Sequence, residues 1–137
     1  MSVLVLDSEA VSRLARAGSG TAPGAVQAAL KASLATGAEV LTPAAALSEQ
    51  CRGDRHDQIV DACLSRHRSI QIVDTTQALA RRVGHLLARA GRGSADHVDA
   101  TVVATAVLGG GGLIITSDPD DLGALADGLP GVTIARV

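Results

Sequence analysis

The sequence feature that most constrains the fold is a short apolar run followed at once by an acid. Val3–Leu6 contains only Val and Leu, and Asp7 comes next. An uninterrupted apolar run of this length is typical of a strand that is buried on both faces of a parallel sheet. In open α/β sheets, ligands bind at the carboxyl ends of the strands. The run therefore predicts an α/β fold and places Asp7 at the edge where a functional site is expected.

Further strands are expected to alternate with helices along the chain. This alternation predicts a three-layer α/β/α sandwich with a mostly parallel, five-stranded sheet. With 137 residues, we expect a single domain spanning 1–137. Short apolar segments predict the later strands, and apolar residues at helical spacing predict the helices. The strands are expected at 3–6, 39–41, 70–73, 113–116 and 132–135, and the helices at 8–17, 23–37, 43–53, 57–67, 75–90, 96–108 and 118–126.

Four local details follow from the same patterns. Pro23 is expected to open the second helix, and Thr42 is expected to cap a helix whose first residue is Pro43. Helical spacing predicts that Ile59 faces the core. The glycine run 109–112 predicts a flexible break. It is not a phosphate-binding loop, because no Gly-Lys-Ser/Thr follows it.

Composition narrows the classes of function. The net charge of −2 gives no bulk positive field that would attract nucleic acid. Eleven of the twelve cations are Arg and the other is Lys31, which suits phosphate binding but fits a biased genome composition equally well. The chain has no Phe, Tyr or Trp, so it does not stack bases on aromatic rings of its own. This argues against a sequence-specific reader of single-stranded RNA.

Targeting and redox signals favour a cytoplasmic protein without membrane contact. No run reaches the roughly 18 apolar residues of a membrane helix, and no basic start with an apolar signal segment is present. Cys51 and Cys63 are expected on helices as reduced, packed thiols rather than as a disulfide or a metal-binding pair.

Four carboxylates stand at informative places. Asp7 follows the first strand, Asp118 follows the fourth, Asp99 heads a buried helix, and Glu49 lies in an Ala/Leu-rich helix. If the first and fourth strands are neighbours, three of these acids meet at one sheet edge. Carboxylates held together raise each other's pKa, and a hard cation such as Mg²⁺ or Mn²⁺ relieves the repulsion. Such a site binds phosphate oxygens and activates water for in-line attack on a phosphodiester.

Helix capping is an alternative explanation for most of these acids. Asp7 is placed to cap the helix that follows it. Asp96 with Asp99, and Asp118 with Asp121, show the spacing of an N-cap residue and an acid at the third helical position. The two explanations are compatible, because helix N-termini also favour anions.

The other polar residues offer no better site. The four histidines are scattered without metal-ligand spacing, although His97 is next to one of the acids. No serine joins a Ser/His/Asp arrangement. Glu49 lies either on a solvent-exposed face or buried beside a partner.

Four stretches fall in the order and spacing of one known family. They are Val-Leu-Val-Leu-Asp-Ser at 3–8, Thr-Pro-Ala-Ala-Ala-Leu-Ser-Glu-Gln-Cys-Arg-Gly at 42–53, Asp-His-Val-Asp-Ala-Thr-Val-Val-Ala at 96–104 and Ile-Ile-Thr-Ser-Asp-Pro-Asp-Asp-Leu at 114–122. Over essentially the whole chain, the pattern resembles the PIN domain, and within it the VapC-type toxin ribonucleases of toxin–antitoxin pairs. The resemblance implies a parallel sheet in the order 3-2-1-4-5. It also implies a Mg²⁺- or Mn²⁺-dependent endoribonuclease that uses activated water.

The resemblance also implies roles for individual residues and for partners. A homodimer is implied, together with a small antitoxin that inserts a basic side chain into the acidic pocket and itself binds DNA. The substrate would be RNA. The implied catalytic and metal-coordinating residues are Asp7, Glu49, Asp99 and Asp118; Asp96 and Asp121 would hold metal-bound water, Thr116 or Ser117 would orient Asp118 or a water, and Arg52 would contact substrate phosphate or the partner's peptide.

Two alternatives belong to other classes of protein. One is a PIN-like module that binds RNA or protein without catalysis, against which the intact set of four acids argues. The other is a phospho-acceptor receiver domain with Asp74 as acceptor. That alternative requires paired acids after the first strand and a lysine after the last. Ser8 follows Asp7 instead, and the only lysine is Lys31.

Overall fold

The computed structural model describes residues 2–17 and 24–137, so the expected helix start at Pro23 lies outside the described residues. Within them the chain alternates strands and helices, as the sequence predicts. The strands are β1 (Val3–Leu6), β2 (Glu39–Pro43), β3 (Ile70–Val73), β4 (Gly112–Thr116) and β5 (Val132–Arg136). The helices are α1 (Ser8–Arg16), α2 (Ala25–Ala35), α3 (Ala44–Gln50), α4 (Asp54–Arg66), α5 (Gln77–Ala90), the 3₁₀ turn η1 (Ser94–Asp96), α6 (His97–Leu108) and α7 (Pro119–Ala126).

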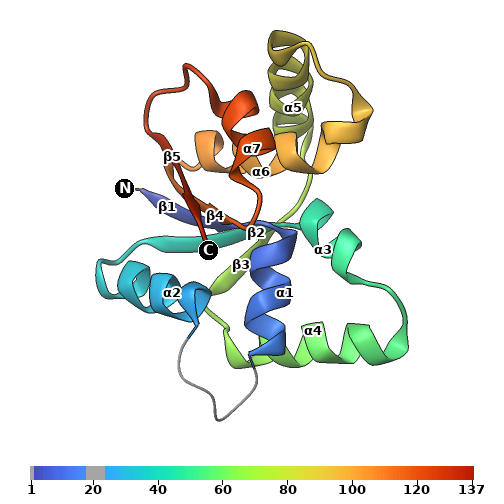
Figure 1. The fold of residues 1–137 in the computed structure, drawn as a ribbon, viewed down its shortest axis with the longest axis vertical. Coiled ribbons are helices and arrows are strands. Elements are labelled where there is room, and N and C mark those ends of the chain that lie inside the picture. Colours follow the sequence, from blue (N-terminus) through green and yellow to red (C-terminus); the bar gives the residue numbers. More distant parts are fainter. Residues whose placement is uncertain (1, 18–23) are drawn as a thin grey trace.

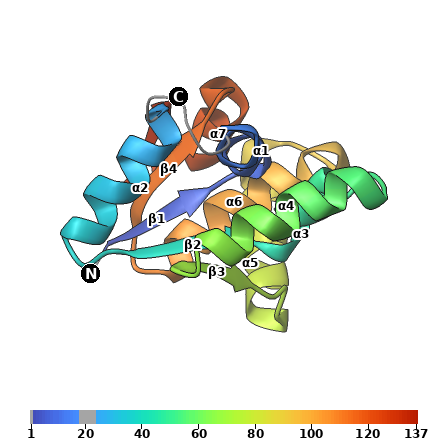
Figure 2. The same ribbon diagram turned by 90° about the horizontal axis from the view of Figure 1, so that it is seen from below.

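The strands form one sheet in the order β3-β2-β1-β4-β5, and every neighbouring pair is parallel (Figure 1). This confirms the predicted strand order and the α/β sandwich. Helices α5, α6 and α7 cover one face of the sheet, and α1, α2 and α4 cover the other (Figures 1 and 2). None of the described helices is both long and apolar enough to cross a membrane.

The core is split by the sheet into two apolar clusters. In β1, Val3 and Val5 pack against α5, α6 and α7, whereas Leu4 and Leu6 pack against α1, α2 and α4. Each of these side chains is at most 4% exposed. Successive side chains of a strand point to opposite faces, so an apolar run without alternation is what a central strand of such a sandwich requires.

The sheet topology also fixes the site. The chain leaves β1 toward β2 and β3 on one side, and it returns through α5 and α6 to form β4 on the other side. The carboxyl ends of β1 and β4 are therefore neighbours at a topological switch point, where open α/β sheets form a crevice. Leu6 of β1 pairs with Ile115 of β4, so the residues that follow both strands emerge together.

The prediction that Thr42 caps a helix beginning at Pro43 is wrong. Thr42 is fully buried in β2, its hydroxyl donates to the Leu6 carbonyl at 2.9 Å, and α3 begins at Ala44. The β1–β2 pairing ends at Val5 and Leu41, so the Thr42 hydroxyl supplies a donor to the carbonyl just beyond it. This bond, together with continued pairing to β3, outweighs the local capping signal.

Three other local expectations need correction. Ile59 is 42% exposed rather than inward, because the buried stripe of α4 runs through Val60 and Cys63. Cys51 lies just after α3 and is exposed, and both cysteines are free thiols. The glycine run does not end before the strand: Gly112 belongs to β4, where a Cβ atom would lie only 1.9 Å from the Val3 carbonyl oxygen.

Candidate active site

The four acids that the sequence singled out line one pocket at the carboxyl edge of the sheet. The pocket has a volume of about 210 Å³. Asp7 comes from the end of β1, Glu49 from α3, Asp99 from the first turn of α6, and Asp118 from the turn between β4 and α7. Five further residues line it: Ser8, Glu9, Gln50, Thr116 and Ser117.

Asp7 is the most enclosed of these acids, with 8% of its surface exposed. It caps α1, because its Oδ1 accepts a hydrogen bond from the Ala10 backbone N–H at 2.8 Å. Burial raises the pKa of Asp7, and hydrogen bonds from the Thr116 side chain and the Ala10 backbone act in the opposite direction. The predicted cap is therefore present, and it orients the carboxylate at the pocket floor.

Thr116 links the ends of the two central strands. It is 1% exposed at the end of β4, and its hydroxyl oxygen accepts a hydrogen bond from the Asp118 backbone N–H at 3.0 Å. It also forms a side-chain hydrogen bond with Asp7. One hydroxyl thus contacts the chain on both sides of the switch point.

Asp99 experiences the strongest electrostatic effect in the site. Burial and, after it, the nearby negative charges of Asp121, Glu49, Asp7 and Asp96 raise its pKa to about 6. The mutual repulsion expected from the sequence is therefore present in the fold. A cation placed among these acids would reverse the effect by favouring the ionised form.

Glu49 is exposed, but it has a partner across the pocket. The Ser8 hydroxyl donates a hydrogen bond to Glu49 Oε2, which joins the start of α1 to the last turn of α3. Of the two alternatives that the sequence left for Glu49, solvent exposure is correct, with the carboxylate turned to the pocket rather than to bulk solvent alone. The role of Ser8 was not predicted, because 41 residues separate the two side chains.

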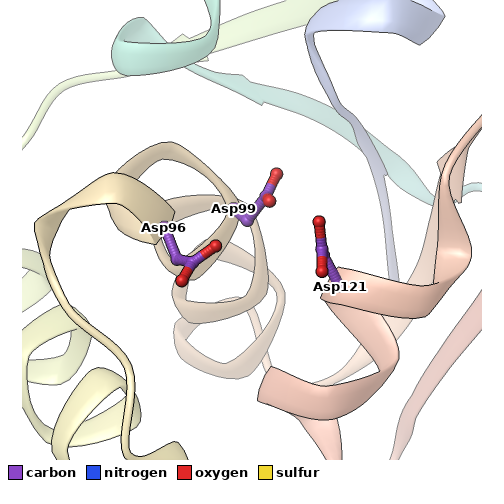
Figure 3. Close-up of side chains that lie close together, drawn as sticks. All are labelled: Asp96, Asp99 and Asp121. Atoms are coloured by element: carbon purple, nitrogen blue, oxygen red, sulfur yellow. The ribbon is translucent and has the colours of Figure 1, made fainter.

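A second acidic group adjoins the pocket. Asp96, Asp99 and Asp121 offer carboxylate oxygens that lie within 4.8 Å of one another, and Figure 3 shows these side chains gathered between α6 and α7. Neither Asp96 nor Asp118 forms the side-chain cap that the alternative explanation expected. Instead, Asp96 and Asp121 both pair with Arg92. Sequence reasoning missed Arg92: its spacing to Asp96 suits a helical ion pair, but nothing signals its contact with Asp121.

The lining of the pocket suits a hard divalent cation. Among the described residues that line it, the polar side chains are carboxylates, hydroxyls and one amide, and none is a cation or a histidine. Oxygen-only donor sets are typical of Mg²⁺ and Mn²⁺ rather than of zinc or copper. Several acids without a cation in one concave site are also electrostatically costly, as the raised pKa of Asp99 shows.

Three other residues from the sequence analysis lie outside this pocket. Arg52 is exposed beyond α3, where its guanidinium donates to the Ser48 carbonyl at 3.2 Å. It lines a separate groove with Arg55, His56 and Ile59. His97 is exposed at the start of α6, and Asp74 follows the edge strand β3, away from the acidic pocket.

A comparison with protein families decides the class of this fold. The model of the PIN domain matches residues 4–127. The chain belongs to the PIN domain family. This membership excludes the receiver-domain alternative and agrees with the position of Asp74. No protein of curated function matches the sequence.

Several solved structures have the same fold. VapBC2 from Rickettsia felis, bound to a DNA fragment from its promoter, matches with a TM-score of 0.65 at 14% identity, covering 98% of both chains. FitAcB from Neisseria gonorrhoeae matches with a TM-score of 0.64 at 15% identity, covering 96% of both chains. DNA-bound VapBC from Salmonella typhimurium matches with a TM-score of 0.60 at 14% identity, covering 99% of this PIN domain and 98% of that chain.

Proposed function

We propose that this PIN domain is a Mg²⁺- or Mn²⁺-dependent endoribonuclease of the VapC type. One observation carries the proposal: four carboxylates from four separate segments converge on one pocket, and none of the described residues that line it is cationic. Such a pocket attracts divalent cations and, on its own, repels the phosphates of RNA. A nuclease function therefore requires the metal, whose charge converts an acidic crevice into one that accepts a phosphodiester.

Each acid has a distinct part in this proposal. Asp7, Asp99 and Asp118 would hold the metal, and Glu49 would be a fourth ligand or the base that orients water. A divalent ion bound here supplies a Lewis acid that polarises a phosphoryl oxygen and makes water acidic enough to attack at neutral pH. Asp7 is fixed in advance by its cap and by Thr116, so the protein does not have to reorder it on binding.

Of the four acids, Glu49 is the best placed to act as a general base. It is more exposed than Asp7, and the Ser8 hydroxyl holds one of its oxygens, which leaves the other to accept a proton from water. The oxygen of that water attacks phosphorus, and one P–O ester bond of the RNA breaks. One fragment keeps the phosphate, and the other gains a hydroxyl whose proton comes from solvent.

The proposal extends to a partner and to an assembly. We propose an antitoxin as partner, a homodimer of the PIN domain and a cytoplasmic location. The similar solved structures support the partner, because they are VapBC and FitAcB assemblies and two of them contain DNA. A basic side chain of such a partner would find complementary charge in the pocket, and the exposed Arg52 offers a separate contact for its peptide or for RNA phosphate.

The test is cleavage of total RNA by the purified protein. Reactions contain Mg²⁺ or Mn²⁺, or EDTA, and Asp99→Asn serves as the inactive control. Protein is quantified by peptide-bond absorbance, because the chain has no Trp or Tyr. We expect cuts that require the metal and vanish in the variant. A folded protein that binds metal but cuts no RNA, both with a partner bound and after the partner has been removed, would contradict catalysis and favour the non-catalytic binding module.

A further inference from the structure

Arg92 is the cation that the structure places among the acids beside the pocket. Its Nη1 lies 3.2 Å from Asp121 Oδ1 and 3.5 Å from Asp96 Oδ1. The side chains of Arg92 and Asp96 are 30% and 24% exposed, so this pair is only partly screened by solvent, whereas Asp121 is 49% exposed and its pairing is screened more strongly. Arg92 therefore bridges the loop before α6 to the first turn of α7.

The acids that Arg92 bridges would otherwise form a second divalent-cation site. Oxygens of Asp96, Asp99 and Asp121 lie within 4.8 Å of one another, a spacing that one ion with oxygen ligands can span. Asp99 belongs to this group and to the active-site pocket at once. A shared carboxylate between neighbouring acid groups is the arrangement that two-metal sites use, with ions roughly 4 Å apart.

We propose that Arg92 takes the place of a second metal ion, so that this PIN domain binds a single divalent cation. The inference rests on the proposed function, because it presupposes a metal in the pocket of Asp7, Glu49, Asp99 and Asp118. A guanidinium stays protonated at all physiological pH values. Its single positive charge offsets one of the two negative charges of Asp96 and Asp121, and Asp99 is left to the ion in the pocket. A second ion would have to displace a tethered charge that already holds two of its three ligands.

Arg92 also acts as a positioning residue. By joining Asp96 to Asp121, it holds the N-terminal turns of α6 and α7 together on one side of the pocket. Asp99 stands on the first turn of α6, and Asp118 precedes α7, so both proposed ligands depend on this distance. Both contacts come from Nη1, so one nitrogen of the guanidinium bridges the two carboxylates.

The test counts Mn²⁺ ions bound per chain, by the electron paramagnetic resonance signal of free Mn²⁺ during titration. We expect one ion for the wild-type protein and two for Arg92→Gln, in which the three acids lose their internal cation. Arg89→Gln is the matched control: Arg89 is exposed on α5, three residues before Arg92, and should leave the count at one. Arg92→Lys keeps the charge and should also bind one ion.

The outcomes separate this inference from the proposed function. Two ions bound to the wild-type protein, or one ion bound to a folded Arg92→Gln, would overturn the role of Arg92 and leave the nuclease proposal standing. No ion bound to the wild-type protein would overturn the metal site itself, and this inference with it. If Arg92→Gln does not fold, the Asp121→Asn variant decides the question. The inference requires this variant to bind one ion, as the wild-type protein does, because Asp121 is not a metal ligand. A variant that binds fewer ions than the wild-type protein contradicts the inference.

Discussion

Asp99 is the single residue whose ionisation the fold changes most clearly. Its pKa rises from 3.8 to about 6 through burial and the surrounding acids. Without metal, the folded protein therefore holds this proton to a higher pH than the unfolded chain does. Stability falls as the pH rises through the interval from 3.8 to about 6, and the loss is complete above it. Without a cation, the ionised Asp99 therefore destabilises the fold, and a bound cation would offset this destabilisation.

Asp99→Asn should remove this dependence. In EDTA at pH 7, we expect the variant to be more stable than wild type by about 1–2 kcal/mol, allowing for the partial exposure of the carboxylate. At pH 4 the difference should nearly vanish, because the wild-type carboxyl is then protonated in the folded state. Urea denaturation at the two pH values measures it. A variant that is clearly less stable than wild type at pH 7 would show that burial and the surrounding acids do not destabilise the ionised form of Asp99.

The two roles of Asp7, as the cap of α1 and as a proposed metal ligand, can be separated by substitution. Asn is as good an N-cap as Asp, so Asp7→Asn should keep the bond to the Ala10 N–H and the stability of α1. Asp7→Ala should lose about 1 kcal/mol with the cap. Both variants should lose RNA cleavage, because neither retains the carboxylate. Thermal melts followed by circular dichroism, beside a cleavage assay, test this; cleavage by a folded Asp7→Asn protein would refute a role for the carboxylate in the chemistry.

Sequence reasoning located the acids but not the groups that hold them. Asp7 and Asp118 could be predicted because a buried strand precedes each of them, and strand ends define the functional edge of the sheet. The contacts of Ser8 and Arg92 could not be predicted, because their partners Glu49 and Asp121 lie far along the chain. Such contacts depend on how the helices pack around the edge, which the local pattern does not encode.

At the scale of elements, buried strands were predicted well and helix starts less well. A continuous apolar run reports burial on both faces directly, so β1 has its predicted bounds. The edge strand β3 also has its predicted bounds, although Gln71 interrupts its apolar residues and most of it is not buried. Helix starts depend on competition between local capping and strand pairing. In 42–43, pairing of β2 with β3 continues through Pro43, and tertiary contacts override the capping signal.

Gly112 is the element-scale position with the strictest requirement. It pairs with Val3 at the start of both central strands, where an added Cβ would overlap the Val3 backbone. We expect Gly112→Ala to destabilise the fold by about 3 kcal/mol or more. Gly84→Ala is the matched control, because Gly84 lies in α5 with nothing within 4 Å of an added Cβ. It should stabilise by about 0.5–1 kcal/mol.

Chemical denaturation of the two glycine variants tests this requirement. The sign of the change should differ between them, with Gly112→Ala below wild type and Gly84→Ala above it. A Gly112→Ala protein with wild-type stability would mean that the starts of β1 and β4 can separate without cost, and the close pairing of Gly112 with Val3 would then not be required by the fold.

At the scale of the whole molecule, the sheet order is what brings four distant segments to one pocket. Because β1 and β4 are neighbours, residues 7 and 118 line the same pocket although they lie 111 positions apart in the sequence. The alternation of strands and helices sufficed to predict the layers, and the resemblance to PIN domains supplied the order 3-2-1-4-5. The acidic pocket, the absence of aromatic residues and the net charge of −2 fit the proposed metal-mediated contact with RNA phosphate better than they fit base stacking.

The most direct measurement compares acids that line the same pocket. Initial rates of total-RNA cleavage with Mn²⁺ are measured for Asp7→Asn, Glu49→Gln, Asp99→Asn and Asp118→Asn, with Glu9→Gln as control. Glu9 also lines the pocket, but its carboxylate pairs with Arg13 and Arg16. We expect each of the four variants to lose at least about 100-fold in rate, and Glu9→Gln to stay within about twofold. Wild-type rates in any of the four, or an equal loss in Glu9→Gln, would contradict a metal centre built from these acids.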